Sequence, residues 1–148
     1  MTFHFPYEHI LSLKEREKDL SLSEMGLLII KKEGIEKELH SLAQKRHDCI
    51  SQWEQVEGGT FISDILQQNE YLDFLDLKIT RLEAELKAVE QDIAEQKEEL
   101  LLKQKEEKTW HLLREKSLDS YMEQQKKIEQ DSLDEIAAIR HYHQRLSL

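Results

Sequence analysis

Apolar residues recur every three or four positions along most of this chain, and polar residues fill the positions between them. In the second half, the steps between apolar residues alternate between three and four positions without a fault. Gln96 and Leu100 continue this alternation. This spacing places one side chain per turn on the same helix face and defines the heptad seam of a coiled coil. The sequence therefore predicts a long helix with a narrow apolar seam. The residues of the seam are Leu72, Leu75, Ile79, Leu82, Leu86, Val89 and Ile93.

The first half carries a second, less regular apolar series. Pro6 suits the first position of a helix, because its fixed φ angle is already helical. The heptad steps are regular from residue 35 onward, although Arg46 interrupts them. Near Gly34 the phase slips by one residue, which predicts a local irregularity in the helix. The apolar residues of this series are Ile10, Leu13, Leu20, Leu27, Leu28, Ile35, Leu39, Leu42, Cys49, Trp53 and Val56.

The stretch "QVEGGTFIS", residues 55–63, separates the two series. Gly58 and Gly59 break the helix, and Thr60 or Ser63 is a suitable cap for the helix that follows. Two seams beside a short connection favour packing against each other as an antiparallel hairpin. The alternative is one continuous helix that dimerises in parallel.

We therefore expect an all-α fold, a long antiparallel two-helix coiled-coil hairpin with a C-terminal helical overhang. The expected domain is a single hairpin over residues 1–148, with a helix at about 6–57, a turn at about 57–61 and a helix at about 61–143.

The two expected helices differ in length. Counted outward from the turn, residue 6 lies opposite residue 111, and about thirty residues continue beyond that point. The phase of the apolar residues is loose in this overhang. A lone helix of mixed composition is marginal in water. The overhang is therefore either a solvated, partly frayed helix or a surface that meets another protein. Its apolar residues are Leu113, Leu118, Tyr121, Met122, Ile128, Leu133 and Ile136.

Composition agrees with a coiled coil and excludes several classes of protein. Charged residues make up 35% of the chain, and Ala, Glu, Lys, Leu and Arg make up about half. The net charge of −10 repels nucleic acids and anionic lipid surfaces. No apolar run approaches the ~20 residues of a membrane span, and the N-terminus lacks the pattern of a secretory signal. With a single cysteine, Cys49, these features predict a cytosolic protein.

The chain carries no motif typical of catalysis or ligand binding. Its glycine pair lacks the lysine and the spacing of a phosphate-binding loop. His141 and His143 point to different helix faces, and His40 and His47 lie two turns apart, so neither pair suits one metal ion. We expect surface histidines, no metal, no cofactor, no small-molecule substrate and no enzymatic activity.

Tyr71 and Phe74 lie three residues apart on one helix face. Leu72 and Leu75 already occupy the seam, so at least one of the two aromatic side chains lies outside it. Packing within the hairpin and contact with a partner are both open interpretations.

Three short motifs together resemble the FliJ family, the soluble component of the flagellar type III export apparatus. Their order and spacing in a chain of this length carry the resemblance. "FHFPYEHILSLKEREKDLSLSE", "YLDFL" and "LDEIA" match the family at Phe3, Phe5, Ile10, Leu11, Leu13, Lys14 and Glu15, then at Tyr71, Phe74 and Leu75, and finally at Leu133, Asp134, Glu135 and Ala137.

The resemblance implies a stalk that enters the hexameric flagellar export ATPase and promotes its assembly and activity. Such a protein contacts the cytoplasmic domain of the export gate, escorts export chaperones and serves flagellum biogenesis and motility. It is cytoplasmic and associates with the inner face of the cell membrane through the export apparatus. It is expected to be a monomer when free.

By the same resemblance, one set of residues faces the ATPase ring, and Tyr71 and Phe74, in the half near the turn, face the gate. The alternatives are a generic self-associating scaffold and the equivalent stalk of a virulence-type secretion system. The expected ring-facing residues are Phe3, Phe5, Leu11, Leu133, Asp134, Glu135 and Ala137.

Overall fold

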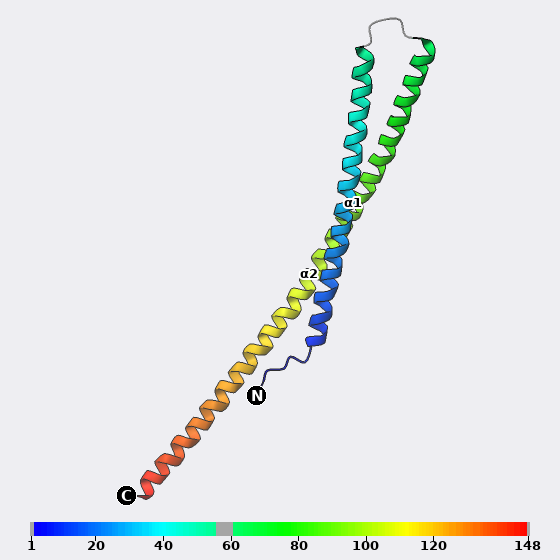
Figure 1. Ribbon diagram of the computed structural model, residues 1–148. Coiled ribbons are helices and arrows are strands. Elements are labelled where there is room, and N and C mark those ends of the chain that lie inside the picture. The colour runs from blue at the N-terminus through cyan, green and yellow to red at the C-terminus, as the bar shows by residue number, and fades with distance from the viewer. Residues whose placement is uncertain (1, 56–60, 148) are drawn as a thin grey trace. The chain divides into compact units, whose positions relative to one another are not determined.

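The computed structural model describes residues 2–55 and 61–147. Within these ranges all regular structure is helical, in α1, Glu8–Glu54, and α2, Ile62–Leu146 (Figure 1). Lys14, near the start of α1, pairs with Glu106, and Arg46, near the end of α1, pairs with Asp76, near the start of α2, so the helices pack antiparallel. The predicted all-α antiparallel pair is confirmed, and the alternative of one continuous helix is wrong. The predicted turn at Gly58 and Gly59 lies outside the described residues.

The helix α1 begins with a proline turn. The Glu8 amide donates a hydrogen bond of 3.2 Å to the Phe5 carbonyl, so Pro6 and Tyr7 form a turn just before the helix. Pro6 therefore precedes the first helical residue by two positions. Glu8 places a negative charge in the first turn, where the helix dipole favours it.

The start of α2 depends on the backbone of Phe61. Its carbonyl accepts hydrogen bonds from the amides of Asp64, at 3.0 Å, and Ile65, at 3.2 Å. Asp64 is the acidic residue of the first turn. Ser63 lies inside the helix, so Ser63 as the predicted cap is wrong. Thr60, the other predicted cap, lies outside the described residues.

The chain divides into two compact units. One comprises residues 19–102, and the other combines Met1–Lys18 with Lys103–Leu148. Each unit contains a part of α1 and a part of α2. Among the described residues, neither helix has a stretch apolar and long enough to cross a membrane.

In the unit of residues 19–102, burial follows the heptad seam on both helices. Leu75 and Val89 are 1% and 3% exposed, and the other predicted seam residues of α2 are half-buried. The predicted seam over residues 72–100 is confirmed. The matching residues of α1 are Ser21, Met25, Leu28, Lys32, Ile35, Leu39, Leu42, Arg46, Cys49 and Trp53.

The apolar series predicted for the first part of α1 is wrong at three of its residues, whereas Leu28 lies in the seam. Leu13, Leu20 and Leu27 are 53%, 63% and 68% exposed, so they lie outside the seam. Buried and half-buried positions instead step by three and four without interruption, and α1 continues through Gly34 with no slip of phase. Polar residues at several seam positions hid the true phase. The seam here runs through Leu11, Lys14, Lys18, Ser21, Met25, Leu28, Lys32 and Ile35.

The phase of α2 beyond Leu100 is strict, whereas the sequence suggested a loose one. Half-buried positions continue in steps of three and four as far as Tyr121, and Gln125, one step further, is half-buried too, while Leu113 and Met122 are exposed. Most of these positions carry charged or polar side chains, and an apolar pattern cannot reveal them. The positions are Lys103, Glu107, Trp110, Arg114, Ser117 and Tyr121.

Two polar contacts cross between the helices in the unit of residues 19–102. The side-chain amide of Gln96 donates to the Ser21 hydroxyl oxygen at 3.0 Å, and Ser21 is 3% exposed. Arg46 Nε lies 2.7 Å from Asp76 Oδ1, so the residue that interrupts the apolar series still occupies the seam. Both partners of that pair are about half exposed, which limits its contribution to about 1 kcal/mol. These contacts chiefly specify which residues face each other.

Leu75 is the most deeply buried side chain of the described core. We expect Leu75→Ala to lower the free energy of unfolding by about 2–5 kcal/mol, because it removes apolar burial and leaves a cavity. Urea unfolding followed by far-ultraviolet circular dichroism measures this change. The matched control is Leu77→Ala, since Leu77 is 53% exposed and should change stability by no more than about 0.5 kcal/mol. Equal losses from both variants would contradict the assigned seam.

Candidate partner-binding surfaces

An aromatic cluster joins the segment before α1 to α2. The ring centroids of Phe3 and Tyr121 are 5.5 Å apart, and those of Tyr7 and Trp110 are 5.9 Å apart. Phe5 is 5% exposed and its ring lies 5.8 Å from Tyr7. Aromatic pairs at such separations stabilise a structure beyond simple burial. The Tyr7–Trp110 contact agrees with the predicted register, and the Phe3–Tyr121 contact extends the paired region further along α2 than expected.

Arg114 contacts this cluster through Phe3 and also pairs with Glu8. Its guanidinium lies 5.9 Å from the centroid of the Phe3 ring, and its Nε lies 3.3 Å from Glu8 Oε2. A guanidinium over an aromatic face gains a modest cation–π attraction. Arg114 therefore occupies a seam position with a side chain that contacts both an aromatic and an acidic partner.

Ion pairs follow the aromatic cluster along the same unit. Lys14 Nζ lies 3.1 Å from Glu106 Oε2 and 3.5 Å from Glu17 Oε2. The hydrogen bond to Glu106 raises the pKa of the Lys14 ammonium above its ordinary value of 10.5. The contribution of this pair to stability is therefore present below about pH 10.5 and is lost as the pH rises through the higher, folded-state pKa.

Two further lysines extend the charged contacts. Lys18 Nζ lies 2.9 Å from Glu107 Oε2, and Lys103 Nζ lies 3.6 Å from Glu17 Oε2. The Glu17 oxygen is buried and forms no hydrogen bond within the described residues, so only longer-range attraction to lysine ammonium groups balances it. Charged pairs thus replace apolar contacts over this part of the seam.

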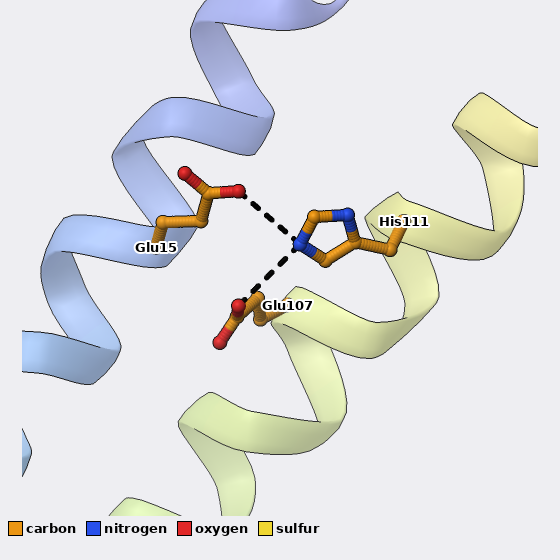
Figure 2. A group of neighbouring side chains, drawn as sticks. All are labelled: Glu15, Glu107 and His111. Carbon is orange, nitrogen blue, oxygen red and sulfur yellow. Dashed lines mark ion pairs between the residues drawn. The ribbon is translucent and has the colours of Figure 1, made fainter.

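A histidine and two glutamates meet beside these pairs, as Figure 2 shows. His111 Nε2 lies 3.2 Å from Glu15 Oε1 and 3.4 Å from Glu107 Oε1. Glu15 comes from α1, whereas Glu107 and His111 are one turn apart on α2. The sequence analysis missed this group. The four-residue spacing of Glu107 and His111 was a visible signal, but the place of Glu15 depends on the register of the two helices.

Beyond Gln125, α2 is exposed on every side. All side chains of residues 126–147 are exposed, and we call this segment the overhang. Leu133, Ile136 and Ile139 are 65%, 47% and 57% exposed. The overhang is therefore an apolar-bearing helix whose surface is open to another molecule, and it is shorter than the thirty residues expected.

The residues predicted to face the ATPase ring divide into two groups. Phe5 and Leu11 are buried and Phe3 is half-buried, so these three pack inside their own unit. The second group lies in the overhang and is exposed. Its members are Leu133, Asp134, Glu135 and Ala137.

Tyr71 and Phe74, predicted to face the gate, are both on the surface of α2. They are 41% and 51% exposed, and Lys78 Nζ lies 5.1 Å from the Phe74 ring centroid. Tyr71 lines an open groove of about 410 Å³ between the two helices, whose lining is Cys49, Trp53, Asp64, Gln67, Gln68 and Tyr71. Both aromatic side chains therefore lie outside the buried seam.

Two antiparallel helices with a heptad seam and an exposed helical overhang define an all-α coiled-coil protein. A family model described as "Flagellar FliJ protein" matches residues 3–146. The chain is also 25% identical over 139 residues to the flagellar FliJ protein of Bacillus subtilis (strain 168), with 93% of this chain and 94% of that relative covered. No solved structure matches the chain significantly.

The chain therefore belongs to the FliJ family, and the resemblance of its three motifs is confirmed. Membership makes it a non-enzymatic component of the flagellar export apparatus.

The aromatic cluster yields a double-mutant test. We expect Phe3→Leu and Tyr121→Leu to show a coupling free energy of about 0.5–1.5 kcal/mol, because each change removes the same ring contact. Urea unfolding of the wild type, both single variants and the double variant measures it. Phe3→Leu combined with Tyr142→Leu is the control, since Tyr142 is 63% exposed and pairs with its neighbour His143. Additive losses for both pairs would contradict a stabilising Phe3–Tyr121 contact.

Proposed function

We propose that this protein is the stalk of the flagellar export ATPase. The overhang enters the hexameric ring, promotes its assembly and raises its rate of ATP hydrolysis. The chain has no part in the chemistry of hydrolysis. Its contribution is mechanical, because a single helix presents different side chains to the chemically identical subunits of a symmetric ring.

One observation carries this proposal, the exposure of apolar side chains along the overhang. The 21 helical residues from 126 to 146 span on the order of 30 Å. An isolated helix of this length and mixed composition gains little from its own hydrogen bonds in water. Burial of its apolar side chains in a partner cavity supplies the missing stabilisation, at ~25 cal/mol per Å² of apolar surface removed from water.

The charge of the overhang supports the same partner. The excess of acidic residues in the chain lies outside residues 126–147, so the overhang itself is close to neutral. Because its charges balance, the overhang needs no excess of either charge sign in a partner cavity. The charges that balance are Lys126, Lys127, Arg140 and Arg145 against Glu129, Asp131, Asp134 and Glu135.

The two groups of predicted ring-facing residues then have different tasks. Phe3, Phe5 and Leu11 pack the N-terminal segment against α2 and form the base from which the overhang extends. Leu133, Asp134, Glu135 and Ala137 contact the ring directly. This division follows from burial, since a buried side chain stabilises its own unit and an exposed one is available to a partner.

Other contacts of the proposed stalk lie on its surface closer to the connection between the helices. Tyr71 and Phe74 bind the cytoplasmic domain of the export gate, and the protein escorts export chaperones. It works in the cytoplasm, held at the inner face of the membrane by the export apparatus. It is a monomer when free, in contrast to a generic scaffold that self-associates.

A truncation tests the stalk function without disturbing the packed seam. A chain that ends at Gln125 keeps every buried and half-buried residue of the described structure. We expect the full chain to stimulate ATP hydrolysis by the purified cognate export ATPase, and the truncated chain to leave the basal rate unchanged. Leu133→Ser with Ile136→Ser should lose most of the stimulation, because both side chains are exposed in the overhang.

The matched control for the double variant is Leu101→Ser with Leu102→Ser. These leucines are 50% and 60% exposed on the same helix but outside the overhang, and stimulation should persist. Stimulation by the truncated chain would overturn the proposed role of the overhang. A stable dimer in light scattering, together with no effect of the full chain on hydrolysis, would favour the scaffold.

A second experiment addresses the gate. We expect Tyr71→Ala with Phe74→Ala to weaken binding to the isolated cytoplasmic domain of the gate by about tenfold or more, as for aromatic hot spots. Calorimetry measures the affinity, and ATPase stimulation should remain unchanged. Leu77→Ala, another exposed apolar residue of α2, is the control. Wild-type affinity of the double variant would remove both aromatic residues from the gate interface.

A further inference from the structure

His111, Glu15 and Glu107 form a group of metal-ligating side chains that the stalk function does not use. One ligand atom from each residue lies within 4.8 Å of the others, and all three residues are half-buried. Figure 2 shows both carboxylates reaching the same ring nitrogen of His111. Histidine nitrogen and carboxylate oxygen are both ligands of divalent metal ions, so two carboxylate oxygens directed at one ring nitrogen form the donor set of a metal site.

The distances match the coordination shell of a small divalent ion. Zinc binds histidine nitrogen and carboxylate oxygen at about 2.0–2.2 Å in a tetrahedron, so neighbouring ligand atoms are about 3.3–3.5 Å apart. The distances from His111 Nε2 to the two oxygens are 3.2 and 3.4 Å. The two carboxylate oxygens lie within 4.8 Å of each other. A zinc ion that replaces the direct contacts therefore keeps the two distances to His111 Nε2 and draws the carboxylate oxygens to the spacing of a tetrahedron.

We propose that Glu15, Glu107 and His111 bind one zinc ion, with water completing the tetrahedron. Glu107 and His111 are one helical turn apart on α2 and supply two ligands from one face. Glu15 supplies the third from α1. The ion therefore bridges the two helices within the unit that also carries the aromatic cluster, and its binding stabilises that unit because the unfolded chain does not hold the three ligands together.

Lys18 competes with the ion for Glu107. Its ammonium lies 2.9 Å from Glu107 Oε2 and 3.2 Å from Oε1. Zinc takes the Oε1 atom, which faces His111, and leaves Oε2 to the lysine. The ammonium nevertheless repels a divalent ion, so removal of its charge should strengthen zinc binding. If His111 had only a structural role, removal of the Lys18 charge would not change zinc binding.

Zinc titration of the full, tag-free chain after treatment with a chelator tests the proposal. Calorimetry should show one zinc ion per chain, and the unfolding temperature should rise with the zinc concentration. Cobalt(II) should give the visible absorption bands of a tetrahedral site. Magnesium should not compete, because it prefers six oxygen ligands and its own water molecules.

Substitutions separate this site from nonspecific binding by other histidines. Glu15→Gln and His111→Gln should each weaken zinc binding by at least about tenfold and abolish the rise in unfolding temperature. His141→Gln, on the exposed overhang, should change neither. Lys18→Gln should bind zinc more tightly than the wild type by a few-fold, as expected for the loss of one nearby positive charge.

Several outcomes would overturn the proposal. Unchanged affinity in Glu15→Gln would show that the ion does not bridge the helices. Unchanged affinity in His111→Gln would place the ion elsewhere. If zinc binds but the unfolding temperature of the wild type does not rise, the folded unit does not present the three ligands as a site. None of these results depends on the ATPase or the gate, so the test stands apart from the stalk function.

Discussion

Every other feature of this protein depends on one interaction, the burial of about one side chain per helical turn between α1 and α2. Few residues are deeply buried, and Leu75 and Val89 are the most buried of α2. A seam this narrow holds little apolar surface, so its stability comes from repetition over many turns. The hairpin can therefore leave a long stretch of α2 exposed. The overhang has no side chains in the seam, so its exposure does not change the stability of the seam.

The two units use this interaction in different chemical forms. In residues 19–102 the seam is mostly apolar, with Ser21, Lys32, Arg46 and Gln96 as polar members. In the other unit, lysine–glutamate pairs and aromatic rings occupy the same geometric positions. Charged pairs weaken as salt rises, whereas apolar contacts do not. The unit that carries the overhang is thus the part of the structure most sensitive to its ionic surroundings, including a bound cation.

The sequence predicted the features that depend on apolar periodicity, and it failed where polar residues occupy the seam. The apolar run from Leu72 to Leu100 correctly predicted the helix, the face of the helix that is buried and the antiparallel packing against α1. Leu13, Leu20 and Leu27 are spaced seven residues apart, as seam residues are. The apolar pattern therefore predicted the seam of α1 on a face that is exposed. The group of Glu15, Glu107 and His111 could not be assembled from the sequence, because a shift of the pairing by a single turn separates its members. The exposure of the motif at Leu133 does not depend on the register of the two helices, since the motif lies beyond the paired region.

The polar contacts across the seam have a consequence for length. A repeating leucine seam is nearly indifferent to a shift of seven residues, because one heptad resembles the next. The Gln96–Ser21 and Arg46–Asp76 contacts occur at unequal spacing along the helices, so any such shift breaks them. These two contacts fix the alignment of the helices within residues 19–102. In the unit that carries the overhang, the Tyr7–Trp110 and Lys14–Glu106 contacts do the same, and they fix how far α2 projects past the start of α1. Insertions in one helix without a matching change in the other would alter this reach by about 10 Å per heptad.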